Sequence, residues 1–88
     1  MAAVLVTEFM DGSALAFLKN RVQVDYAPNI CENHQEIMRR IAGVHALIVR
    51  NRTQVTADIF ACANHLKAVG RLGVGLDNID LEAAEHLN

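Results

Sequence analysis

The chain has 88 residues, of which 52% are hydrophobic, and a formal net charge of −2. That length fits one small domain, and the charge balance argues against a surface for nucleic acid or anionic membranes. No apolar run approaches the ~20 residues of a membrane span, and the first residues lack the basic segment of a signal peptide. Two cysteines do not make a disulfide framework. We therefore expect a reduced, cytoplasmic protein.

The first part of the chain alternates between apolar runs and an amphipathic segment. Residues 3–7 (AVLVT) form a continuous valine-rich run, which is typical of a strand buried on both faces. Residues 11–20 predict a short helix with Asp11 as its N-cap. Residues 21–27 alternate with period two and stop at Pro28, which predicts an edge strand.

The rest of the chain repeats this alternation. Residues 32–43 predict a helix that ends at a glycine, and residues 45–50 (HALIVR) predict a buried strand. A further helix over 56–65, a fourth strand over 66–71 and a last helix over 80–87 follow. Such alternation predicts an α/β fold, a parallel sheet of about four strands with helices on both faces. We expect this sheet to be incomplete, because the last helix leads into no further strand.

Three glycines in the stretch KAVGRLGVGLDNID raise the question of a nucleotide site. A dinucleotide-binding turn has the pattern Gly-x-Gly-x-x-Gly, in which the third glycine lets helix and strand pack closely. Here Gly73 and Gly75 are followed by Leu76, Asp77 and Asn78, so the third glycine is absent. The Gly-Lys-Ser/Thr of a phosphate-binding P-loop is absent as well. The spacing therefore argues against a nucleotide site, and we assign no residue of the chain to a cofactor.

Two arginines, Arg50 and Arg71, end the third and fourth predicted strands. Ligands of open α/β sheets bind outside the carboxyl ends of the strands. If the two strands are neighbours, about 4.8 Å apart, both guanidiniums can converge on one carboxylate, phosphate or sulfonate. Backbone N–H groups between Gly73 and Gly75 can complete such an anion site. The alternative, solvated strand ends followed by a simple turn, stays open on the residues alone.

A metal site is a second alternative, because Cys31 and His34 repeat the Cys-x-x-His spacing of Cys62 and His65. Four such ligands could hold zinc. However, Cys62 falls on the apolar face of its predicted helix, where a free cysteine behaves as a small hydrophobic residue. We also expect the helices that carry the two pairs to cover opposite faces of the sheet. We therefore assign no metal ligands.

Two stretches, ALIVRNRTQVTADIF (46–60) and LKAVGRLGVGLDNIDLEAA (66–84), carry a resemblance to a known family. They resemble the N-terminal segment of the D-isomer-specific 2-hydroxyacid dehydrogenases, above all the phosphoglycerate dehydrogenase branch. The first forty residues match in pattern only. In this family two flavodoxin-like or Rossmann-like domains enclose the active site. The first, discontinuous domain binds the substrate, and the inserted second domain binds NAD or NADP.

The resemblance implies an NAD(P)-dependent oxidoreductase that acts on a small anionic 2-hydroxy acid or 2-oxo acid. It implies that Arg50, Arg71, Val74 and Gly75 bind the substrate. The catalytic arginine, glutamate and histidine of the family, and its cofactor domain, match nothing in this chain. Residues 1–88 are therefore expected to be the N-terminal part of the substrate-binding domain, inactive alone, of a homodimeric full-length enzyme.

Arg52 departs from the small polar or alanine residue that is common at that place in the family. With Arg50 and Arg71 it would make the site more cationic, which favours a phosphorylated or sulfonated acid, similar to 3-phosphoglycerate or sulfolactate. The second hypothesis is a self-standing flavodoxin-like module that binds an anion or a partner without catalysis.

Overall fold

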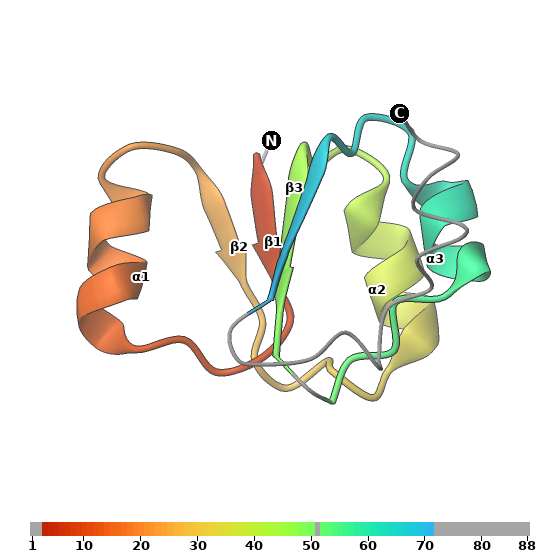
Figure 1. Ribbon diagram of the computed structural model, residues 1–88, viewed down its shortest axis with the longest axis horizontal. Coiled ribbons are helices and arrows are strands. Elements are labelled where there is room, and N and C mark those ends of the chain that lie inside the picture. The colour runs from red at the N-terminus through yellow and green to blue at the C-terminus, as the bar shows by residue number, and fades with distance from the viewer. Residues whose placement is uncertain (1–2, 51, 72–88) are drawn as a thin grey trace.

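A computed structural model describes residues 3–50 and 52–71, and in this part of the chain strands and helices alternate strictly (Figure 1). The elements are β1 (Val4–Val6), α1 (Gly12–Lys19), β2 (Val24–Tyr26), α2 (His34–Ile41), β3 (Ala46–Val49), α3 (Ala57–Cys62) and β4 (Ala68–Arg71). The predicted order of elements is confirmed over these residues. The helix predicted for 80–87 lies outside them.

The strands form one parallel sheet in the order β2-β1-β3-β4. This is the strand order of a flavodoxin-like sheet, in which the first strand lies inside and the second at the edge. The prediction of an edge strand before Pro28 is therefore confirmed. Because the strands are parallel, their carboxyl ends meet at one edge of the sheet, the lower edge in Figure 1.

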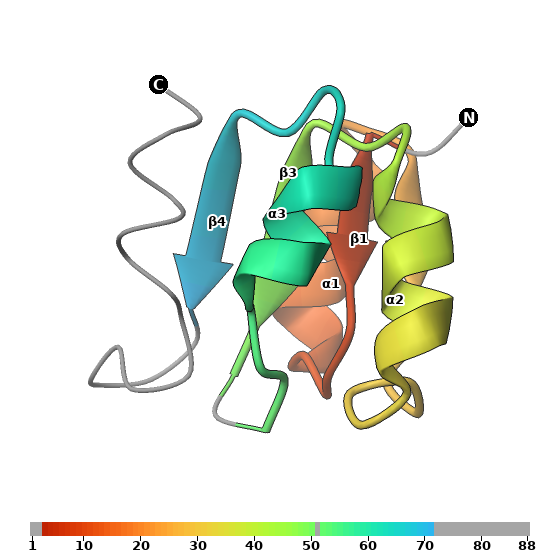
Figure 2. The same cartoon turned by 90° about the vertical axis from the view of Figure 1, so that its right-hand side faces the viewer.

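Helices cover both faces of the sheet, as predicted: α1 lies on one face, and α2 and α3 lie on the other (Figures 1 and 2). The expectation that the helices of the two Cys-x-x-His pairs lie on opposite faces is wrong. The chain moves in one direction along the sheet from β2 to β3 and from β3 to β4. Right-handed crossovers that move in the same direction place their helices on the same face.

The larger core layer lies between the sheet and the helices α2 and α3. Its buried members are Leu5, Ile37, Ile41, Val44, Leu47, Val49, Val55, Ile59, Phe60, Ala63 and Leu66. Val4, Val6 and Met10 form a smaller layer under α1, against which Leu15 and Leu18 are only partly buried. No residue of α1 is buried, whereas Ile37 and Ile41 anchor α2. The sheet is therefore held mainly from the side of α2 and α3.

The predicted N-cap of the first helix is confirmed, since Asp11 accepts a hydrogen bond of 3.1 Å from the Ser13 N–H. Asn33 caps α2 in the same way, accepting from the Glu36 N–H at 3.2 Å. Such caps satisfy N–H groups that have no partner within the helix. The helices on either side of β2 in the chain thus begin where the sequence supplies a capping side chain.

The third helix is shorter than the prediction of 56–65 and ends at Cys62. Thr56 occupies its N-cap position, but its side chain makes no capping bond. Its hydroxyl lies 3.4 Å from the His34 Nε2 instead, which links the beginnings of α2 and α3. In the part of the chain that the structure describes, no helix has the length and apolar character needed to cross a membrane.

Candidate functional site

The two arginines that the sequence singles out lie at the carboxyl edge of two neighbouring strands. Strands β3 and β4 pair in parallel with Val49 opposite Arg71, so the two strands are neighbours. Arg71 ends β4, and Arg50 is the residue after the end of β3. This register staggers the two arginines by one residue. Convergence of both guanidiniums on one anion stays a prediction, and Val74 and Gly75 lie outside the described residues.

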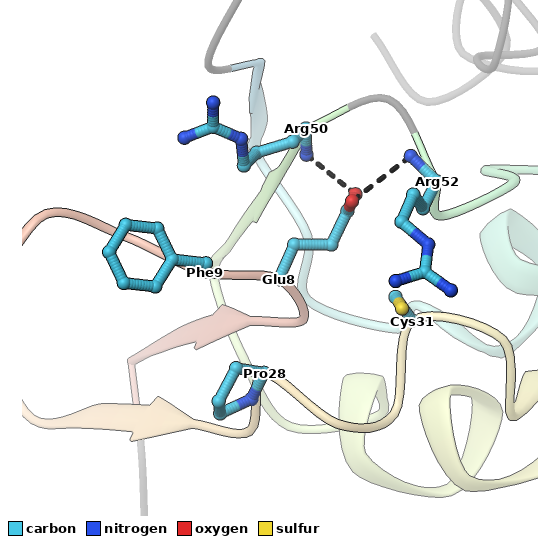
Figure 3. Close-up of a pocket in the computed structure, with 6 residues that line it drawn as sticks. All are labelled: Glu8, Phe9, Pro28, Cys31, Arg50 and Arg52. Carbon is cyan, nitrogen blue, oxygen red and sulfur yellow. Dashed lines mark hydrogen bonds between the residues drawn. The ribbon is translucent and has the colours of Figure 1, made fainter.

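A buried carboxylate that the sequence analysis did not single out organises this edge. Glu8 follows the end of β1 and is only 4% exposed. Its Oε2 accepts hydrogen bonds from the Arg50 N–H at 2.7 Å and the Thr53 N–H at 3.0 Å. Its Oε1 accepts from the Arg52 N–H at 3.0 Å (Figure 3 draws the bonds to Arg50 and Arg52). One carboxylate thus fixes the backbone on both sides of residue 51.

Two hydroxyls strengthen the same junction between β1 and the segment after β3. The Oγ1 atoms of Thr7 and Thr53 lie 2.8 Å apart, and both residues are fully buried. The Thr7 N–H also donates to the Ile48 carbonyl at 3.2 Å. Buried polar groups need partners of this kind, because leaving one unpaired costs about 1–3 kcal/mol. Residues 7 and 8 therefore join the end of β1 to residues 50, 52 and 53.

The ionisation of Glu8 follows from these contacts. Burial raises the pKa of its carboxyl, but the hydrogen bonds from the Thr53 and Arg50 N–H groups, the Thr53 hydroxyl and the Arg52 N–H together outweigh burial. The net result is a pKa below the ordinary value for glutamate, so Glu8 is ionised at neutral pH. A general base works best with a pKa near the operating pH. Glu8 is thus suited to hold backbone, not to exchange protons.

A pocket of about 190 Å³ opens beside Glu8. Its lining consists of Glu8, Phe9, Pro28, Cys31, Arg50 and Arg52. In Figure 3 the Arg50 side chain extends towards Phe9, whereas the Arg52 side chain extends towards Cys31. The two backbones therefore meet at one carboxylate while their guanidiniums diverge. Pockets for drug-sized ligands have volumes of about 300–1,000 Å³, so this pocket fits a smaller molecule.

Arg52 stands between this pocket and a second one. The second pocket, of about 240 Å³, is lined by Cys31, Glu32, His34, Arg52 and Gln54. The Arg52 guanidinium forms an ion pair with Glu32, and the two side chains are 61% and 70% exposed. The hydrogen bond with Glu32 raises the pKa of Arg52, which keeps its charge. The predicted extra cation is therefore at the pocket, with an acidic partner beside it.

The two Cys-x-x-His pairs do not form a cluster of metal ligands in the described part of the chain. Cys31 and Cys62 are free thiols, and Cys62 packs against the larger core layer, as its apolar face predicted. The His65 ring lies edge-on to the ring of His45, with centroids 6.3 Å apart. Within residues 3–50 and 52–71, no group of three or more histidine, cysteine or acidic side chains is placed to hold a metal ion.

Comparison with known proteins gives a consistent result for nearly the whole chain. The family model for the D-isomer specific 2-hydroxyacid dehydrogenase, catalytic domain, matches residues 4–88. The chain is 47% identical over 83 residues to the (S)-sulfolactate dehydrogenase of Chromohalobacter salexigens, which covers 94% of this chain and 27% of that protein. It is 38% identical over 84 residues to the D-3-phosphoglycerate dehydrogenase of Methanocaldococcus jannaschii, with 96% and 16% covered.

Solved structures agree with these relatives. A protein from Thermus thermophilus superposes with a TM-score of 0.86 at 32% identity, over 96% of this chain and 27% of that one. A putative D-isomer specific 2-hydroxyacid dehydrogenase from Polaromonas superposes with a TM-score of 0.85 at 25% identity, over 99% and 28%. The chain thus spans 27% and 16% of the length of the two curated relatives described above.

Proposed function

The chain belongs to the D-isomer specific 2-hydroxyacid dehydrogenases, and from this premise we propose that it is the first segment of a substrate-binding domain. The full-length protein would be an NAD- or NADP-dependent oxidoreductase that acts on the CH–OH group of a small anionic 2-hydroxy acid. The observation that carries this proposal is the pocket at the carboxyl edge of the sheet, to which Arg50 and Arg52 both contribute.

The role of this chain in the reaction is to bind and orient the acid. A guanidinium presents paired N–H donors that match a carboxylate, phosphate or sulfonate. Arg50 lines the pocket and follows β3 directly, so the strand brings its backbone to the carboxyl edge of the sheet. The proposed substrate-binding set consists of Arg50, of Arg71 at the end of the neighbouring strand β4, and of Val74 and Gly75 further along the chain. Proton transfer at the substrate is left to residues outside this chain.

The described residues do not form a site that fits NAD or NADP. The pocket of about 190 Å³ is smaller than the about 300–1,000 Å³ typical even of pockets for drug-sized ligands. The sequence also lacks the Gly-x-Gly-x-x-Gly turn that holds a pyrophosphate at a helix N-terminus. We therefore assign the cofactor, NAD or NADP, to another part of the full-length protein. The 88-residue chain alone is proposed to be inactive.

The substrate is proposed to carry a second anionic group besides its carboxylate. Two arginines line the pocket with diverging guanidiniums, which suits an acid charged at both ends (Figure 3). The ion pair of Arg52 with Glu32 is exposed, and exposed pairs contribute little because solvent screens them. A phosphate or sulfonate can therefore replace Glu32 at small cost. The names of two relatives, a sulfolactate and a phosphoglycerate dehydrogenase, support this substrate class.

The test is an assay of the full reading frame that contains this chain. Purified protein is mixed with NAD⁺ or NADP⁺ and with lactate, sulfolactate or 3-phosphoglycerate, and cofactor reduction is recorded. We expect turnover, with a higher kcat/KM for the two doubly anionic acids than for lactate. The variant Arg52→Gln should reduce the ratio of kcat/KM for the doubly anionic acids to kcat/KM for lactate. Equal kcat/KM values for all three acids would refute the proposal that the substrate carries two anionic groups. Absence of turnover with every acid would refute the proposal that the full-length protein is a dehydrogenase.

We further propose that the full-length protein is a homodimer in the cytoplasm. Size-exclusion chromatography with light scattering tests the first point, with a mass of two chains expected and a mass of one chain contradicting it. Binding of sulfate by the 88-residue chain alone, without any turnover of the longer protein, would support the alternative of a self-standing anion-binding module.

A further inference from the structure

We propose that Glu8 is a positioning residue for the substrate-binding Arg50: its carboxylate fixes the backbone of residues 50, 52 and 53 and so sets where the Arg50 guanidinium meets the acid. This inference rests on the proposed function of the pocket. Glu8 itself contributes no positive group to an anion. Its effect on the substrate passes through the arginine whose N–H it holds at 2.7 Å.

The geometry is that of a clamp on the turn after β3. Three backbone N–H groups, of Arg50, Arg52 and Thr53, point at one carboxylate. Hydrogen bonds to an ionised acceptor are shorter and stronger than neutral ones. The buried hydroxyl pair of Thr7 and Thr53 closes the same junction from the other side. The backbone is therefore held at three positions after β3: Arg50, Arg52 and Thr53.

A carboxylate in an anion-binding pocket is unfavourable unless it has another role. Glu8 lines the same pocket as Arg50 and Arg52, and its negative charge repels an anionic substrate. If Glu8 were only a nearby charge, removing that charge would strengthen binding of the acid. If Glu8 positions Arg50, removing its acceptor atoms weakens binding. The two roles thus predict opposite signs for one substitution.

Glutamine separates these roles because it keeps the size of the side chain and changes two properties. It removes the charge, and it offers a single acceptor oxygen with an NH₂ donor in place of the other oxygen. The Oε2 of Glu8 now serves Arg50 and Thr53, and the Oε1 serves Arg52. In Glu8→Gln, at least one of these backbone donors faces another donor. When the amide oxygen keeps the bonds from Arg50 and Thr53, that donor is the Arg52 N–H, and the two remaining bonds lose their charge assistance. The turn then relaxes, and the Arg50 guanidinium shifts from its position.

The experiment is a double-mutant cycle in the full-length dehydrogenase with sulfolactate as the varied substrate. We expect Glu8→Gln to raise KM about tenfold or more, since a misplacement of about 1 Å can cost up to 10²-fold. In an Arg50→Gln background the same substitution should change KM less than about twofold, because residues that act as a unit are not additive. Asp58→Asn removes an equal charge in the exposed first turn of α3 and should leave KM unchanged.

Each outcome decides the matter. An unchanged or lowered KM in Glu8→Gln, or an equal rise in both backgrounds, overturns the positioning role, whereas a merely structural defect lowers kcat and yield in both backgrounds alike. If Glu8→Gln does not fold, Glu8→Asp replaces it, which keeps the charge and shortens the reach by one methylene. A rise in KM that depends on Arg50 is again expected, and an unchanged KM overturns the proposal.

The failure of the proposed function can be told apart from the failure of this inference. If the wild-type protein turns over no hydroxy acid, the same cycle is run on sulfate binding, followed by NMR of protein labelled with ¹⁵N-arginine. The inference then predicts that Glu8→Gln weakens sulfate binding only while Arg50 is present. Equal sulfate affinity in wild type and Glu8→Gln would overturn it.

Discussion

Replacing Glu8 by glutamine should destabilise the fold by an amount that the hydrogen bonds allow us to work out. The amide oxygen of the introduced glutamine can keep the two bonds that Oε2 now accepts, while its NH₂ faces the Arg52 N–H. A backbone donor left without a partner costs about 1–3 kcal/mol. The two remaining bonds lose their charge assistance, at about 1 kcal/mol each, since bonds to charged groups contribute about 1.5–3 kcal/mol and neutral ones about 0.5–1.5 kcal/mol. The expected loss in free energy of unfolding is about 3–5 kcal/mol.

Urea unfolding at pH 7, followed by circular dichroism, measures this loss. The m-value should stay constant, so that the shift of the midpoint reports stability alone. Glu32→Gln is the matched control, because it removes the same charge from an exposed ion pair that solvent screens. If Glu8→Gln and Glu32→Gln differ from wild type by the same small amount, the carboxylate does not clamp the turn.

Three further predictions concern single groups near or away from the pocket. The pKa of Glu8 is lower in the folded protein than in the unfolded chain, where it is about 4.3. The ionised carboxylate therefore contributes its full stability above a pH of about 4.3, and this contribution is lost as the pH falls through the folded pKa. The difference in unfolding free energy between wild type and Glu8→Gln should shrink below a pH of about 4.3. Hydrogen bonds from Arg39, above all, and its neighbour lower the pKa of Glu36 to about 2, and a carboxyl ¹³C titration by NMR should show this value moving upward in Arg39→Ala. Thr53→Val should cost about 1–3 kcal/mol in urea unfolding, because it leaves the buried Thr7 hydroxyl unpaired and removes the bond from the Thr53 hydroxyl to Glu8. Valine at both positions removes the unpaired hydroxyl and should cost less; an equal or greater loss in the double variant would contradict the pairing.

The order of elements could be predicted from the sequence, because it depends on local patterns. Continuous valine-rich runs indicate buried strands, and their alternation with amphipathic segments indicates a parallel sheet. The faces of the helices could not be read in this way. Whether α2 and α3 lie on the same face depends on the order of the strands in the sheet, and local sequence patterns do not reveal that order.

The candidate site could also be predicted from the sequence only in part. Arg50 was found because it follows a clearly apolar strand, and the edge where ligands bind is a general property of such sheets. Glu8 was not singled out, although a charge directly after a buried strand is an available signal. Its role depends on three backbone N–H groups that lie more than forty positions away in the chain. The pairing of Arg52 with Glu32 likewise joins different loops.

A crystal structure of the full-length protein with sulfolactate bound tests the central claim most directly. That claim is that the pocket beside Glu8 receives an anionic hydroxy acid through Arg50. The account predicts an anionic group of the acid within about 3 Å of the Arg50 guanidinium, with the Glu8 bonds to the turn intact. An acid bound elsewhere, with this pocket empty, would contradict it.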